Sequence, residues 1–177
     1  MPIKKDISGK TRIRVEDFSQ GLYQFALGAA AKIQQELLGQ SALDQHRQHI
    51  ESATLGLLAS ALWLVKYIAD QTYRNRDFYY RCQQVLEEKF CEQIDKASDG
   101  QCDHKELIDY LNKLHSIYDK AWSNNSEPGR TWWLAQAMAK EILDTDDPPE
   151  LAIVILVGEI ESTLAMGVRL VRSYIIY

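Results

Sequence analysis

Apolar side chains recur every three to four positions along nearly the whole chain, which is the spacing of amphipathic α-helices. No segment shows a competing strand pattern, and no internal repeat is visible. We therefore predict a single-domain, all-α bundle of about five to six helices. The predicted helical regions cover about 15–38, 42–69, 77–97, 103–118, 131–143 and 144–175.

Several helix boundaries are marked by local signals. Gly39 and Gln40 interrupt the first pattern, and Ser41 is expected to cap the next helix. Asp103 followed by Glu106 predicts a helix start of the capping-box type. The segment 123–129 is a loop by composition. Residues 55–68 are apolar on two faces, which predicts a central, buried helix.

Composition narrows the class of protein. The 177 residues are 46% hydrophobic and 25% charged, as in an ordinary globular domain. Three cysteines without CxxC spacing favour a reducing compartment, and the first residues do not resemble a signal peptide. The apolar runs 53–65 and 151–157 are shorter than a membrane span. We therefore expect a cytoplasmic protein with no membrane segment.

Charge is arranged in blocks. Residues 1–14 carry a net charge of +4 and are expected to form a basic, flexible segment outside the helical domain 15–177. Residues 66–81 carry +2, whereas 87–109 carry −5 and 140–161 carry −6. The total of −5 disfavours a protein that coats nucleic acid by bulk attraction, but it permits a local basic patch.

Catalytic patterns are not found in the sequence. None of the four histidines stands three residues after a glutamate, as a di-iron bundle requires. No arginine is followed by histidine at the spacing common in small helical ribonucleases. His46 and His49 share a helix face but have no evident third ligand. The chain is therefore expected not to be an enzyme and to need no cofactor.

One segment resembles a calcium loop. Residues 95–106 lie between two predicted helices and place oxygen ligands at the spacing of a twelve-residue EF-hand loop, with Gly100 at the sharp turn. Ala97 stands where another ligand is expected, and no second loop exists to pair with this one. The alternative is a plain interhelical turn. The candidate calcium ligands are Asp95, Asp99, Gln101, Asp103 and Glu106.

The segment 73–81 interleaves arginine with aromatic residues. Arginine pairs with phosphates and aromatic rings stack on bases, so this pattern suits contact with a nucleic-acid strand. The same residue types are also enriched in protein interfaces, and they could simply anchor a helix junction in the core. The sequence does not decide between these three interpretations.

Three segments resemble the small α-helical subunit of type III CRISPR effector complexes, the Cmr type in particular. They are 21–27, with its apolar stripe; 52–65, with its long apolar run; and 158–166, continuing through Arg169 and Arg172. The segments stand in the family's order and cover under half of the chain. The Asn-Gly step that usually opens the second segment is absent, since Thr54-Leu55-Gly56 stands there.

The resemblance implies a non-catalytic subunit of an RNA-guided antiviral complex that touches the RNA backbone and neighbouring subunits, including copies of itself. The candidate RNA contacts are chosen from charge, not from a motif. They are Arg74, Arg76, Arg81, Arg169 and Arg172. Two alternatives remain: a calcium-responsive helical protein, and a helical adaptor of unknown protein partner.

Overall fold

The computed structural model describes residues 10–73 and 76–176. Within them the chain folds into seven α-helices, one 3₁₀ helix and two short strands. The elements, in order, are β1 (Thr11–Ile13), α1 (Val15–Leu38), η1 (Ser41–His46), α2 (Arg47–Ser52), α3 (Thr54–Thr72), α4 (Arg76–Ala97), α5 (His104–Trp122), α6 (Arg130–Leu143), α7 (Glu150–Arg172) and β2 (Tyr174–Ile176). The all-α class is confirmed.

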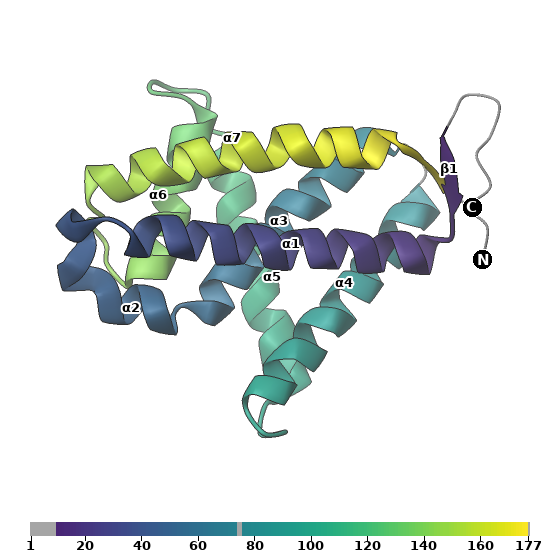
Figure 1. Cartoon of the computed structure of the whole chain (residues 1–177), viewed down its shortest axis with the longest axis horizontal. Helices are drawn as coiled ribbons and strands as arrows, with labels where there is room; N and C mark the ends of the chain where they lie inside the picture. Colours follow the sequence, from purple (N-terminus) through teal and green to yellow (C-terminus); the bar gives the residue numbers. More distant parts are fainter. Residues whose placement is uncertain (1–9, 74–75, 177) are drawn as a thin grey trace.

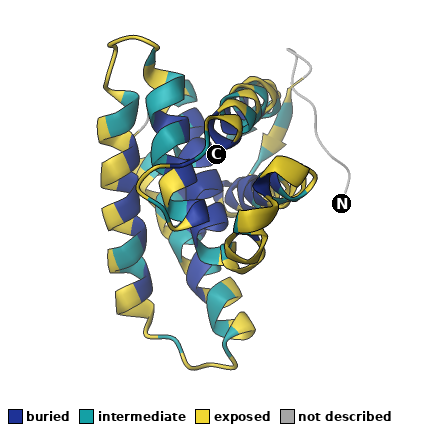
Figure 2. Ribbon diagram, turned by 90° about the vertical axis from the view of Figure 1, so that its left-hand side faces the viewer, coloured by how far each residue is buried: buried dark blue, intermediate teal, exposed yellow. Residues whose placement is uncertain are grey.

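The helix α3 is the centre of the bundle, as its two apolar faces predict. Every residue from Gly56 to Val65 is buried, and α3 packs against α1, α4, α5, α6 and α7. The surrounding helices turn one apolar stripe inward and expose their opposite side, which Figure 2 shows as dark blue and yellow faces. The burial of these stripes supplies most of the favourable free energy of folding.

The predicted helical region 42–69 is not one helix. It consists of η1, α2 and α3, and the direction changes by 85° between the first two elements and α3. The break falls at Ala53, next to Ser52, whose hydroxyl donates to the carbonyls of Gln48 and His49. Such back-bonding by serine accompanies bends in helices. The predicted cap at Ser41 is wrong, because Ser41 is the first residue of η1 and no side chain caps that helix.

The two strands are a second difference from the sequence prediction. β1 and β2 pair in parallel, with Thr11 opposite Tyr174 and Ile13 opposite Ile176. Residues 11–13 therefore belong to the folded domain and not to a separate N-terminal segment. Three-residue strands are too short to produce a detectable alternation, although their β-branched and aromatic residues suit a strand.

By length and composition, α7 meets the criterion for a membrane-spanning helix. The helical pair formed by Ser41–Ser52 and Thr54–Thr72 also meets it if its two bent halves are joined. Buried core helices of proteins without a membrane segment pass the same criterion. One third of the most apolar window of α7 is buried inside the bundle, so most of this apolar segment lies outside the core.

Candidate nucleic-acid interface

A cluster of aromatic rings joins four helix ends at one end of the molecule. The ring of Phe18, at the start of α1, lies 5.6 Å from Tyr73, 5.7 Å from Phe78 and 6.0 Å from Tyr174, between ring centroids. The Tyr73 hydroxyl donates to the carbonyl of Val171 at 2.9 Å. The start of α1, the end of α3, the start of α4 and the end of α7 are therefore fixed to one another.

Arginines from three separate segments stand around this cluster, and together they define the basic end. β1 runs beside β2, and the amide of Thr11 donates to the carbonyl of Ser173 at 3.1 Å. Figure 1 shows β1, the start of α1 and the end of α7 at the same end of the molecule. The basic end comprises Arg12, Arg14, Arg76, Arg81, Arg169 and Arg172, all of them exposed.

Four of the five predicted arginines belong to the basic end: Arg76, Arg81, Arg169 and Arg172. The fifth, Arg74, lies outside the described residues. Sequence reasoning missed Arg12 and Arg14, because it assigned them to a flexible segment. The +4 charge of residues 1–14 was the signal that could have found them.

One arginine of the basic end, Arg81, already forms an ion pair within the fold. The Arg81 guanidinium lies 2.6 Å from the Glu16 carboxylate, which links α4 to α1. A backbone hydrogen bond at Glu16 itself is the largest cause that lowers the pKa of Glu16, and burial opposes it in part. The hydrogen bond and charge of Arg81 and the charge of Arg14 lower this pKa further. Within the described residues, Arg76, Arg169 and Arg172 form no ion pair.

The local balance of charge remains positive. In the described parts of segments 10–17, 70–81 and 169–176 there are seven lysines and arginines and four acids. Tyr80, on α4 one turn after Arg76, is 55% exposed and lies beside Tyr79, with ring centroids 5.9 Å apart. The basic end thus offers guanidinium groups together with an exposed aromatic ring.

The predicted calcium loop folds as a turn between α4 and α5. Asp99 and Gly100 both adopt positive φ angles, and the Gly100 amide donates to the carbonyl of Asp95 at 2.9 Å. The Asp103 carboxylate accepts hydrogen bonds from the amides of Lys105 and Glu106, which confirms its predicted cap.

The remaining candidate ligands of that loop, Gln101 and the Glu106 carboxylate, are exposed. Across residues 10–73 and 76–176, no group of three or more His, Cys, Asp or Glu side chains is placed to hold a metal ion. This search includes His46 and His49, which lie in η1 and α2.

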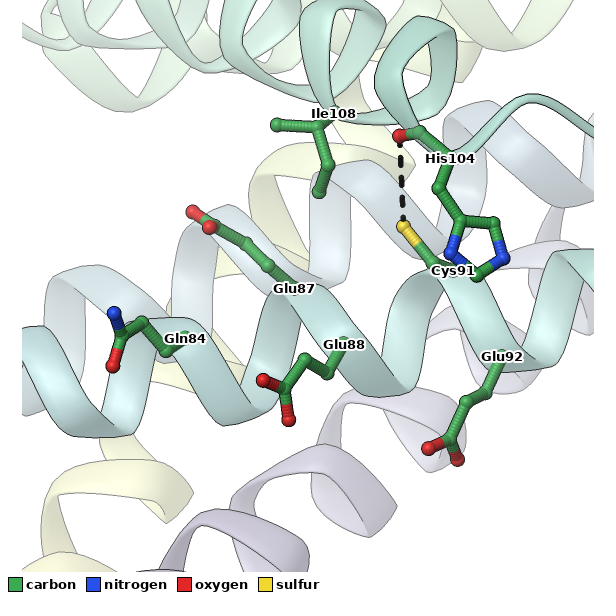
Figure 3. Close-up of a pocket in the computed structure, with 7 residues that line it drawn as sticks. All are labelled: Gln84, Glu87, Glu88, Cys91, Glu92, His104 and Ile108. Carbon is green, nitrogen blue, oxygen red and sulfur yellow. Dashed lines mark hydrogen bonds between the residues drawn. The ribbon is translucent and has the colours of Figure 1, made fainter.

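A hollow of about 390 Å³ lies between α4 and α5 (Figure 3). Its lining residues are Gln84, Glu87, Glu88, Cys91, Glu92, His104 and Ile108. Glu88 and Glu92 extend away from His104 in this view. Burial, then the charges of Glu87 and Asp95, raise the pKa of the Cys91 thiol, so the reactive thiolate is disfavoured. Its three carboxylates give this hollow a negative charge, which repels a phosphate backbone.

Polar side chains between α3 and α5 form hydrogen bonds with one another and with the backbone. One ring nitrogen of His115 is 3.1 Å from the carbonyl of Ala59, and the Tyr118 hydroxyl is 3.0 Å from that of Ser60. The Trp63 indole donates to Asp119 at 2.8 Å, beside a small hollow of about 170 Å³. These contacts satisfy buried polar atoms, which otherwise cost free energy.

No family model, no curated protein and no solved structure matches the chain.

Proposed function

We propose that this protein is a non-catalytic helical subunit that binds the backbone of single-stranded RNA through its basic end. The observation that carries the proposal is the gathering of six exposed arginines, from three segments of the chain, around one aromatic cluster. Guanidinium groups form strong paired hydrogen bonds with phosphate oxygens. Such contacts give affinity without reading the base sequence.

The exposed ring of Tyr80 adds a stacking surface for a base next to the phosphate-binding groups. The acidic hollow between α4 and α5 begins at Gln84, further along α4 than Arg81, so repulsion from its carboxylates would direct an RNA strand toward the basic end. The resemblance of three segments to the Cmr-type small subunit extends the proposal to a place in an RNA-guided antiviral complex.

The test is fluorescence anisotropy with a labelled single-stranded RNA of about 20 nucleotides, at 50 and 200 mM salt. The triple variant R12Q/R14Q/R76Q removes three charges from the basic end without touching α7. The control K105Q/K113Q/K140Q removes three exposed charges elsewhere, so both variants have the same net charge.

We expect the basic-end variant to bind at least tenfold more weakly than the control. Its salt dependence, as the slope of log K against log salt, should be shallower by about 2, since each lost phosphate contact reduces the slope for a single strand by about 0.7. Equal weakening by the two triple variants, or no binding by the wild type at 50 mM salt, would contradict the proposal.

A further inference from the structure

Between Leu151 and Met166 the outward face of α7 is apolar except for Glu161, and it has no neighbour within the described structure. Leu151, Val154 and Met166 are 38%, 51% and 46% exposed. Gly158 and Ala165 are also exposed, and they share this face because the positions recur at helical spacing. Figure 1 shows α7 along one edge of the bundle, with α1 beneath it. Exposed apolar patches of this kind mark interaction surfaces.

The two ends of this face carry opposite charges. Asp146, Asp147 and Glu150 stand at the start of α7, and Arg169 and Arg172 stand at its end. All five of these side chains are exposed. A partner helix that complements this face must therefore be basic where α7 begins and acidic where α7 ends.

We propose that the partner is a second copy of this chain, packed with its α7 antiparallel to the first. Glu150 and Arg172 are each eleven residues from Glu161, so a two-fold axis near Glu161 would bring Glu150 of one copy opposite Arg172 of the other. The same contact forms twice, as two-fold symmetry requires, and the assembly closes at two copies. Gly158 and Ala165, on either side of the axis, let the helices approach closely.

Two other arrangements fit less well. A parallel pair of α7 helices would place acid against acid at one end and arginine against arginine at the other. A membrane would have to accommodate the Glu161 carboxylate, which is exposed in the middle of the face. In the antiparallel pair the two Glu161 side chains meet near the axis, so neutralising them should tighten the dimer.

The test is light scattering with size-exclusion chromatography over about 1–100 μM protein, with circular dichroism to confirm that each variant is folded. The wild type is expected at about 41 kDa, twice the chain mass of 20.3 kDa. E150R and R172E should each be monomeric, because each places like charges opposite one another. An equimolar mixture of the two should form a heterodimer, since both pairs of charges then attract.

Two further variants separate this interface from RNA binding. V154E should raise the dimer dissociation constant at least tenfold without weakening RNA binding, because the monomer keeps every arginine of the basic end and frees Arg172 from Glu150 of the other copy. E161Q should lower the dissociation constant severalfold. A monomeric wild type at 100 μM, or a mixture of E150R and R172E that stays monomeric, would overturn the proposal. So would a monomer that instead binds phosphatidylcholine vesicles through this face.

Discussion

The two ends of α7 differ in how their charge is assembled. The acidic end comes from one continuous stretch, 144–150, where four acids stand within seven residues. The basic end comes from β1, the start of α1, the start of α4 and the end of α7, held together by the rings around Phe18. A local sequence is enough to create the first surface, whereas the second exists only in the folded chain.

This difference has a practical consequence. Loss of packing near Phe18 would disperse the arginines and leave the acidic end unchanged. RNA binding should therefore depend on the integrity of the core at one end of the bundle.

Phe18→Ala should have the largest effect. Phe18 is 2% exposed, and truncation of a buried phenylalanine costs about 3–5 kcal/mol of unfolding free energy. We expect that loss in urea denaturation, with RNA affinity also reduced under conditions where the variant remains folded. Met138→Ala, in a fully buried site on α6, is the matched control. It should destabilise by about 2–5 kcal/mol without changing RNA affinity. Equal loss of RNA affinity in both variants would show that RNA binding depends on overall stability and not on packing around Phe18.

Gly167→Ala tests the packing of α7 close to the basic end. An added Cβ would stand 2.3 Å from Cδ1 of Ile68 and 3.2 Å from a ring carbon of Phe25. We expect a loss of about 1–3 kcal/mol, the usual cost of overpacking. Gly28→Ala is the control, because nothing lies within 4 Å of its added Cβ. It should gain about 0.5–1 kcal/mol from helix propensity, and thermal denaturation compares the two.

His115 is a buried titratable side chain between α3 and α5. Burial, then the charge of Lys66, lowers the pKa of His115 to about 4, and the bond to Ala59 opposes this only in part. Between pH 6.5 and 4 the unfolded chain binds a proton that the folded chain does not, so stability falls as the pH drops through this range. The expected loss at pH 5 is roughly 2 kcal/mol relative to pH 8.

Urea denaturation at the two pH values checks this prediction against His115→Gln, in which that part of the pH dependence disappears. His49→Gln, at an exposed position, should retain it. A wild type and a His115→Gln variant with the same pH dependence would show that the buried imidazole does not titrate as stated.

Arg81→Gln should have the smallest effect on stability. Its partner Glu16 and Arg81 are both more than half exposed, and ion pairs of this kind contribute little. We expect a melting temperature within experimental error of the wild type. RNA affinity should fall less than for Arg76→Gln, because the Glu16 carboxylate already neutralises part of the positive charge of Arg81. A larger loss of affinity for Arg81→Gln would show that the ion pair opens on binding.

Much of the helical architecture followed from the sequence alone. The bounds of α1, the buried centre of α3, the cap at Asp103 and the loop 123–129 were predicted because each depends on side chains within a few residues of one another. The bend at Ala53 and the pairing of β1 with β2 were not. A strand of three residues is stabilised by its distant partner, and that partner leaves no periodic signal in the sequence.

The same distinction applies to the candidate site. The sequence determined which residues can bind phosphate and that the start of α7 is acidic. Only the tertiary structure decided that Arg12 and Arg14 stand with Arg76, Arg169 and Arg172, because parallel pairing and the aromatic cluster around Phe18 bring together residues more than 150 positions apart. Charge is a property of single residues, but a binding surface depends on distances that packing alone sets.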